Sequence, residues 1–276
     1  MNKVWLITGA SSGFGRALTE AALAAGDVVV GAARRPEALD ELVAAHPDQM
    51  EALRLDVTDI LAIAAAVRDV VARHGRIDVL VNNAGRTHVG AFEETTDDEL
   101  RALFDLHVLG PAALVRAVLP YMRERRSGAI VQMSSVGGQG SFAGFSAYSG
   151  TKFALEGMSE ALADEVSDFG IKVLIVEPGA FRTSLFEGSR AGFSADSGVY
   201  EKVSGTRAYV SGGDGAQAGD PAKAAALIRA ALEADRTPLR LPLGDDSVTT
   251  VLDHLDQVRA EVMAWEKRTR DTAFDE

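Results

Sequence analysis

Tyr148 and Lys152 are the residues whose types and spacing most directly suggest chemistry. They lie four residues apart in a segment of helical composition, so a helix would place both side chains on one face. The pKa of an ordinary tyrosine is about 10, and lowering it by about 3 units requires about 4 kcal/mol. One ammonium about 4 Å away supplies about that much at an effective dielectric constant of about 20. We therefore expect Lys152 to make Tyr148 a usable proton donor, although such a pair, met alone, is more often a packed tyrosine beside a solvated lysine.

Ser135 and a glycine-rich turn add a hydrogen-bond donor and an anion site. Ser135 ends the apolar segment 128–135, at the edge where open α/β sheets bind ligands, and could donate a hydrogen bond to a substrate oxygen. Residues 8–16 read TGASSGFGR, directly after another apolar segment. Such glycines permit a tight turn and a close approach of backbone N–H groups to a pyrophosphate at a helix N-terminus. Taken alone, the turn would be an ordinary strand-to-helix connection about half the time.

Two arginines follow the second apolar segment, residues 27–33, at the position where dinucleotide folds distinguish their cofactors. An acid there accepts hydrogen bonds from the adenosine ribose, whereas an arginine accommodates a 2′-phosphate. The chain has Arg34 and Arg35, which predicts NADP(H) in preference to NAD(H), with Arg34 the better candidate. The alternative is that both are solvated residues at a helix start, where positive charge is unfavourable. Asp56 could accept from an adenine amino group or merely cap a turn with Thr58.

Short apolar segments alternate with helical ones, and this alternation must position the side chains above. Strands are predicted at 4–8, 27–33, 51–57, 77–83, 128–135 and 171–179, and helices at 13–25, 36–45, 59–74, 96–125 and 147–169. Such alternation requires right-handed crossovers and a parallel sheet covered by helices on both faces. We therefore predict an α/β fold of Rossmann type, a doubly wound parallel sheet of about seven strands, in a single domain spanning residues 1–276.

Residues 183–219 break the alternation, because small, polar and glycine-rich stretches replace the apolar pattern. A loop of this length inside a compact domain is usually functional or disordered, so we expect a mobile substrate-binding flap. The alternative is a poorly ordered surface insertion. Beyond it, Asp220 and Pro221 begin a helix that extends to residue 234, residues 239–244 could form a last strand, and residues 245–270 look helical.

The composition is that of an ordinary globular protein and argues against several functional classes. Lys and Arg number 28 against 40 Asp and Glu, and the net charge of −12 disfavours nucleic acid and anionic lipid as partners. The absence of cysteine excludes disulfides, thiolate metal sites and a cysteine nucleophile, and it fits a reducing cytoplasm. The histidines show no metal-ligand spacing, and no apolar run approaches the ~18 residues of a membrane span. We therefore expect a cytoplasmic protein with no metal site and no membrane partner.

The motifs occur in one order along the chain, and together they closely resemble the single-domain short-chain dehydrogenase/reductase family. The resemblance rests on the glycine turn, on NNAG at residues 82–85, on Ser135 thirteen residues before Tyr148, on Lys152 four residues after it, and on Pro178-Gly179. It covers roughly residues 3–183, and beyond them only the general layout matches.

The resemblance implies a role for each matched residue. Tyr148 would be the general acid for carbonyl reduction and the base for alcohol oxidation, Lys152 would lower its pKa and hold the nicotinamide ribose, and Ser135 would orient the substrate oxygen. The cofactor would be held along the sheet edge by Gly9, Ser11, Ser12, Gly13, Phe14, Gly15, Arg34, Arg35, Asp56, Val57, Asn83, Ala84, Gly85, Tyr148, Lys152, Pro178, Gly179 and Thr183.

One position departs from the family pattern. The family usually has an asparagine in the helix after the fourth strand, within N-V-x-G, where it supports a water in a proton relay from the lysine; here residues 107–110 read HVLG. A neutral imidazole has one donor and one acceptor and could hold that water, which would make His107 a catalytic residue. Alternatively, His107 is a packed histidine with no catalytic role, and the sequence leaves both interpretations open.

We therefore predict an NADP(H)-dependent oxidoreductase that interconverts a ketone or aldehyde and an alcohol. The substrate would lie between Tyr148 and the flap, beside the candidate lining residues Phe142, Phe145, Phe181, Leu185 and Phe186. The alternatives are an NAD(P)-dependent epimerase or dehydratase, which more often has a G-x-x-G-x-x-G turn and a larger substrate domain, and a non-catalytic NADP-sensing regulator, which would be expected to lose the Tyr/Lys pair. The resemblance also suggests a homodimer or homotetramer through the helices at 96–125 and 147–169.

Overall fold

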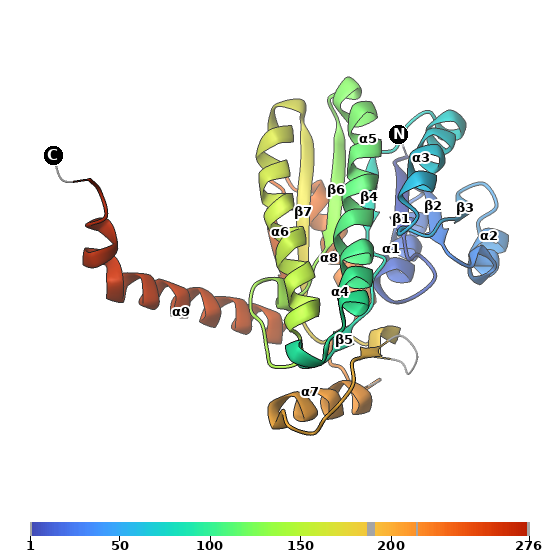
Figure 1. The fold of residues 1–276 in the computed structure, drawn as a ribbon. Coiled ribbons are helices and arrows are strands. Elements are labelled where there is room, and N and C mark those ends of the chain that lie inside the picture. Colours follow the sequence, from blue (N-terminus) through green and yellow to red (C-terminus); the bar gives the residue numbers. More distant parts are fainter. Residues whose placement is uncertain (1, 187–190, 214, 275–276) are drawn as a thin grey trace.

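A parallel sheet of seven strands, in the order β3-β2-β1-β4-β6-β7-β9, organises the protein (Figure 1). The computed structural model describes residues 2–186, 191–213 and 215–274. The chain starts in the middle of the sheet, builds one half outward to β3, and then crosses back to β4 to build the other half. This order confirms the predicted doubly wound fold of Rossmann type.

The elements follow the predicted alternation closely. The strands of the main sheet are β1 (Val4–Thr8), β2 (Val28–Ala33), β3 (Met50–Arg54), β4 (Val79–Asn82), β6 (Gly128–Met133), β7 (Ile171–Pro178) and β9 (Arg240–Leu243). The helices are α1 (Gly13–Ala24), α2 (Asp40–Ala45), α3 (Ile60–His74), α4 (Asp97–Phe104), α5 (Gly110–Arg125), α6 (Ser146–Val166), α7 (Glu201–Gly212), α8 (Pro221–Glu233) and α9 (Asp245–Arg270). A π-helical turn, Asp105–Leu109, joins α4 to α5, and a second small sheet pairs β5 (His88–Val89) with β8 (Gly192–Phe193).

The central strands are buried on both faces, which explains their nearly continuous apolar sequences. In β1, Trp5 and Ile7 pack with α1 and α8, whereas Leu6 packs with α3, α5 and α6 on the opposite face. Two apolar clusters therefore sandwich the sheet, and its carboxyl edge is the side left for a ligand.

Local sequence signals set the helix ends. Asp59 caps α3 by accepting a hydrogen bond from the Ala62 N–H, and Gly75 ends that helix in the left-handed conformation with φ 75°. Thr96 and Glu99 form a reciprocal capping box at the start of α4. These caps fix where each helix leaves the sheet, and thus where the connecting segments begin.

The helical stretch Asp97–Arg125 bears on the expectation of no membrane partner. It is 29 residues long and contains an 18-residue window apolar enough to cross a membrane by length and composition. Half of that window is buried inside the protein, and a core helix meets the same criteria. These criteria do not distinguish a membrane span from a core helix, so the expectation of no membrane partner stays a prediction.

Residues 183–219 are more regular than the predicted flap. Their described part contains β8, which pairs with β5, and the helix α7, whose Val203 and Val210 pack against Val89. A parallel bridge between Phe181 and Gly219 holds the two ends of the segment together. Residues 187–190 and 214 lie outside the described residues. The segment is thus anchored at several points, because long-range contacts compensate for its weak apolar pattern.

Candidate active site

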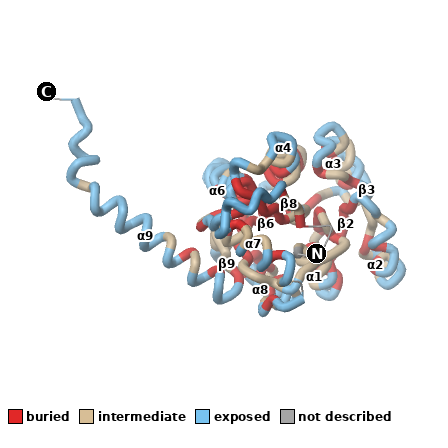
Figure 2. The backbone as a smooth tube through the Cα atoms, turned by 60° about the horizontal axis from the view of Figure 1, so that its bottom comes forward, coloured by how far each residue is buried: buried red, intermediate tan, exposed pale blue. Residues whose placement is uncertain are grey.

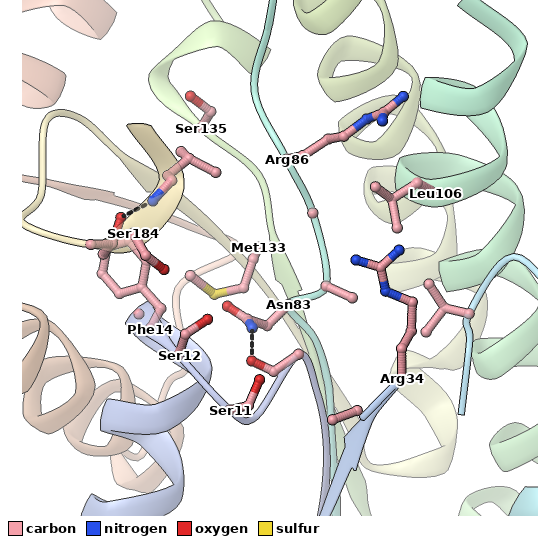
Figure 3. A pocket seen from close by; sticks show the side chains of 18 of the residues that line it. Ser11, Ser12, Phe14, Arg34, Asn83, Arg86, Leu106, Met133, Ser135 and Ser184 are labelled. Carbon is pink, nitrogen blue, oxygen red and sulfur yellow. Dashed lines mark hydrogen bonds between the residues drawn. The ribbon is translucent and has the colours of Figure 1, made fainter. Parts of the chain in front are cut away.

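A cleft of about 640 Å³ opens along the carboxyl edge of the sheet (Figure 3). It lies beside the neighbouring strands β1 and β4, where the order of the strands along the chain reverses. Ligands bind at this reversal of strand order in open α/β sheets. Two predicted site residues, Gly15 and His107, do not line the cleft. The predicted residues that do are Gly9, Ser11, Ser12, Gly13, Phe14, Arg34, Arg35, Asp56, Val57, Asn83, Ala84, Gly85, Ser135, Tyr148, Lys152, Pro178, Gly179 and Thr183.

The glycine turn has the geometry of a pyrophosphate cradle. Gly9 and Gly13 have positive φ angles of 64° and 53°, a conformation that other residues rarely adopt. A Cβ on Gly15 would lie 2.2 Å from the Gly9 carbonyl oxygen, so α1 can approach the strand end only with glycine there. Asn83 Nδ2 donates to the carbonyls of Thr8 (2.8 Å) and Gly9 (3.2 Å), which ties the end of β4 to the turn. The first turn of α1 reads GFGR and lacks a carboxylate, so its N–H groups and helix dipole favour an anion.

Arg34 and Asp56 define the far end of the cleft. Figure 3 shows the Arg34 side chain leaving the end of β2 and extending into the cleft. Asp56 Oδ1 accepts hydrogen bonds from Thr58 N (3.0 Å) and Thr58 Oγ1 (2.8 Å), so this carboxylate caps a turn. Burial alone would raise the pKa of Asp56, but the Thr58 hydrogen bonds and the Arg34 charge outweigh it and leave the pKa below its usual range.

Tyr148, Lys152 and Ser135 come together at the other end of the cleft. Tyr148 and Lys152 lie one turn apart on α6, with Lys152 Nζ 5.7 Å from the centre of the tyrosine ring. Lys152 Nζ donates to the Met133 carbonyl at 2.8 Å, and burial lowers its pKa to about 8 against the opposing charge of Glu156.

The pKa of Tyr148 differs from the sequence expectation in direction. Burial raises this pKa above its ordinary value, and a hydrogen bond with Ser135 offsets only part of the rise. The lowering expected from Lys152 is therefore not provided by the protein groups themselves. The expectation counted the attraction of a nearby ammonium but not the cost of ionising a phenol that is 8% exposed.

His107 lies behind the cleft, and both of its ring nitrogens have protein partners. Nε2 accepts a hydrogen bond from the Arg86 N–H at 3.2 Å, and Nδ1 lies 2.9 Å from Thr151 Oγ1. Thr151 Oγ1 donates its hydrogen to the Tyr148 carbonyl (2.6 Å), so this hydroxyl must accept a hydrogen bond from Nδ1–H of His107. Since Nε2 accepts and therefore carries no proton, the ring is the neutral tautomer with its proton on Nδ1. Burial and the Lys152 charge hold the pKa of His107 well below its usual value. Neither nitrogen is left for a relay water, and this arrangement favours the packed-histidine interpretation.

The floor of the cleft is joined to the first turn of α9. A Cβ on Gly179 would lie 2.2 Å from Asp246 Oδ1, so any side chain there would have to displace the Asp246 carboxylate. Asp246 Oδ2 accepts a hydrogen bond from Ala180 N at 2.7 Å, and Ser247 Oγ donates to the Glu177 carbonyl at 2.6 Å. The exit of β7 and the start of α9 therefore form one rigid junction.

A buried pair of carboxyl groups behind Lys152 was not predicted. Ser134 Oγ donates to Glu156 at 2.5 Å, and Gln139 Nε2 donates to Glu156 and, at 3.1 Å, to Glu177. Arg240 lies 3.4 Å from Glu156 and 3.5 Å from Glu177. Burial, with the charge of Glu156, raises the pKa of Glu177 to about 8, so this group keeps its proton near neutrality. The residues are distant in sequence, and no local pattern marks them as neighbours.

The aromatic lining differs in part from the expectation. Phe181 and Leu185 line the cleft, whereas Phe142 and Phe145 do not, and the side chain of Phe186 lies outside the described part of the chain. The lining also includes residues that were not among the predicted site residues, namely Ala32, Ala33, Ala38, Leu55, Thr58, Arg86, Ala102, Leu106, Met133, Ser134, Ala180 and Ser184. Within the described ranges, no group of three or more His, Asp or Glu side chains is placed to hold a metal ion.

Comparisons with known proteins agree with this architecture. The chain matches the family model described as short chain dehydrogenase over residues 3–192. Oxidoreductase BOA17 of Botryotinia fuckeliana is 39% identical over 250 residues, which cover 90% of this chain and 91% of the relative. The structure of a short-chain dehydrogenase from Streptomyces avermitilis is 66% identical with a TM-score of 0.94, covering 99% of this chain and 98% of that one.

A further solved structure concerns the cofactor. A metagenomic short-chain oxidoreductase in complex with NADP is 34% identical, with a TM-score of 0.61, over 65% of this chain and 83% of that one. The family match, the relatives and the sheet order are consistent with one another. The chain therefore belongs to the short-chain dehydrogenase family, as an oxidoreductase that acts on CH–OH groups with a nicotinamide cofactor.

Proposed function

We propose that the protein interconverts a carbonyl compound and an alcohol with NADP(H), using Tyr148 as the general acid and base. The observation that carries this proposal is the convergence of Tyr148, Ser135 and Lys152 at one end of a cleft whose other end holds Arg34. The lining side chains of Phe181, Leu185 and Leu106 support an uncharged, partly apolar substrate.

The residues of the cleft fit a nicotinamide dinucleotide. The N-terminus of α1 would bind the pyrophosphate, Arg34 and Arg35 the 2′-phosphate, and Gly179 and Thr183 would line the nicotinamide end. The NADP-bound relative supports the choice of cofactor. When bound, NADPH supplies a hydride to the carbonyl carbon.

Tyr148 supplies the proton in the direction of reduction. Because burial holds the pKa of Tyr148 above its ordinary value, the phenol is uncharged near neutrality and can act as an acid. Its O–H bond breaks as the substrate oxygen takes the proton, while Ser135 donates a hydrogen bond to that oxygen. Lys152, whose pKa is about 8, is an ammonium below that pH and stabilises the tyrosinate that remains. In the direction of oxidation, the tyrosinate takes the proton from the alcohol.

Tyr148→Phe tests the proton donor. Turnover, followed by nicotinamide absorbance over a panel of carbonyl compounds and alcohols, should fall by about 10²–10⁴-fold, the usual contribution of general acid–base catalysis. NADPH binding, measured by fluorescence titration, should survive. Tyr121→Phe makes the same chemical change on α5 away from the cleft and should leave turnover unchanged. Wild-type turnover in Tyr148→Phe would refute the mechanism.

Arg34→Ala tests the cofactor assignment. Loss of a charge-assisted hydrogen bond to the 2′-phosphate, worth about 1.5–3 kcal/mol, should reduce the ratio of kcat/KM for NADPH over NADH by about 10–100-fold. Arg101→Ala removes an exposed arginine from α4 and serves as the control. If Arg34→Ala and Arg35→Ala both leave the ratio unchanged, the assignment of the 2′-phosphate site is incorrect.

We further propose that the protein works in the cytoplasm and that α5 and α6 associate with those of a second copy. The molar mass in solution and cell fractionation test these two points.

A further inference from the structure

The last helix, α9, leaves the body of the protein after its first turns. Ser247 and Val251 are buried, and His254 packs near Gly140. From Leu255 onward every residue of α9 is exposed except Glu266, which is half-buried. Figures 1 and 2 show these turns projecting away from the sheet and its covering helices. Residues 255–270 form about 24 Å of helix, at about 1.5 Å per residue, without cover from the described body.

The projecting turns carry an apolar stripe with the spacing of a coiled coil. Apolar residues alternate at intervals of three and four through three heptads of α9, at Val248, Val251, Leu255, Val258, Val262 and Trp265. The last four are 51%, 42%, 61% and 58% exposed, respectively. A seam of this kind is normally buried against another helix, and a contiguous exposed apolar patch marks an interaction site.

We propose that the outer end of this seam, formed by Val258, Val262, Trp265 and the next heptad position, Thr269, pairs with the same segment of a second copy of the chain, with the two helices antiparallel. Val262 of each helix then faces Trp265 of the other, around a twofold axis between them. Arg268, which stacks on its own Trp265 with its guanidinium 5.3 Å from the ring centre, borders this contact. Because the two-fold arrangement places the bodies at opposite ends of the paired helices, the bodies do not compete for the same space.

The charges beside the seam select this orientation and register. With Val262 opposite Trp265, heptad geometry places Arg259 opposite the partner's Glu266 and Glu261 opposite the partner's Arg268, and the symmetry repeats both ion pairs. A parallel pair in register would instead place Glu261 beside the partner's Glu266. Antiparallel pairing shifted by one heptad toward the body would place Arg259 opposite the partner's Arg259 and Glu261 opposite the partner's Glu261. Like charges meet in both alternatives.

The same charges argue against a membrane as the occupant. The turns from residue 255 to residue 270 carry four basic and three acidic side chains, whereas helices that lie on anionic membranes have a strongly basic polar face. The chain as a whole has a net charge of −12, which anionic lipid would repel.

Val262→Asp tests whether the seam is an interface between copies. The molar mass of the full-length protein by light scattering should fall to half of the wild-type value, because a buried carboxylate would face the partner's Trp265. Ala260→Asp adds the same charge on the opposite side of α9 and should leave the mass unchanged. If Val262→Asp has the wild-type mass, the seam does not join copies of this chain, and the proposal is overturned.

Charge exchange tests the antiparallel register. Glu261→Arg should weaken association by at least tenfold in sedimentation measurements, and adding Arg268→Glu should restore it. These two residues are seven positions apart on one helix, too far to form an ion pair within it, so the rescue must come from the second copy. A parallel pair predicts the opposite result, since Glu261→Arg would face the partner's Glu266 and strengthen association. Tighter association of Glu261→Arg, or no rescue by the double variant, overturns the proposed register.

Discussion

Replacing Glu177 by glutamine should remove a loss of stability that the wild-type protein suffers as pH rises. Glu177 is fully buried, and burial together with the charge of Glu156 raises its pKa from 4.5 to about 8, against the opposing effects of Arg240 and Gln139. The native state therefore binds more protons than the unfolded state between these two values. The stability conferred by the protonated group is complete below pH 4.5 and is lost as pH rises toward 8.

The size of the effect follows from the same pair of values. One proton of difference changes the free energy of unfolding by about 1.4 kcal/mol per pH unit. Between pH 6 and 8, with the native group half ionised at the upper limit, the wild type should lose about 2 kcal/mol relative to Glu177→Gln. For a domain of this size, about 2 kcal/mol corresponds to roughly 4–8 °C in Tm. The side chain of Glu177 is 1% exposed, so the value is not discounted for a solvent-exposed carboxylate.

Urea unfolding at pH 6, 7 and 8 provides the measurement. Contributions from other groups cancel in the difference between wild type and Glu177→Gln, so this difference in the free energy of unfolding should grow by about 2 kcal/mol from pH 6 to pH 8. Glu160→Gln is a matched control, because Glu160 also pairs with Arg240 but is 61% exposed, and its difference from wild type should stay nearly constant. Parallel curves for wild type and Glu177→Gln across this range would refute the assignment of a protonated, buried Glu177.

Two further substitutions test the geometry around the cleft. Gly15→Ala would place a Cβ 2.2 Å from the Gly9 carbonyl oxygen and should weaken NADPH binding at least tenfold in fluorescence titrations. The control Gly150→Ala, whose Cβ would meet nothing within 4 Å, should bind NADPH normally. Equal affinities of the two variants for NADPH would contradict the close approach at the turn. Thr151→Val would leave Nδ1 of His107 buried without a partner and should lower the free energy of unfolding by about 1–3 kcal/mol. A change close to zero would show that the hydrogen bond between His107 and Thr151 does not stabilise the folded protein.

Elements with a strong local apolar pattern could be predicted from the sequence, and those that depend on distant contacts could not. The segment 4–8 is buried on both faces, and its composition alone indicates a central strand. In α7, Val203 and Val210 are the buried residues, and their partner Val89 lies more than a hundred positions away. The pairing of β5 with β8 involves two residues on each strand, too few for any periodicity.

The same distinction separates what was predicted in the site from what was not. The position of Ser135 followed from the rule that carboxyl ends of parallel strands share one edge, and most of the remaining cleft lining followed from the family resemblance. The direction of the pKa shift of Tyr148 could not be predicted from the sequence, because it depends on how completely the surroundings of the phenol exclude water. Glu156 and Glu177 interact because the packing of α6 against β7 joins residues far apart in the chain. The partners of His107 likewise come from a different helix and from the segment after β4.

The junction between β7 and α9 connects the last helix directly to the floor of the cleft. At about 1.5 Å per residue, the 26 residues of α9 extend about 39 Å from this junction. Any rotation of its first turn must carry Ala180 with it or break the hydrogen bond to Asp246. A force applied at the far end of α9 thus acts directly on residues that line the cleft. Linkage makes this coupling reciprocal. If the orientation of α9 changes the free energy of binding a ligand in the cleft, then binding of that ligand changes the free energy difference between the orientations of α9 by the same amount.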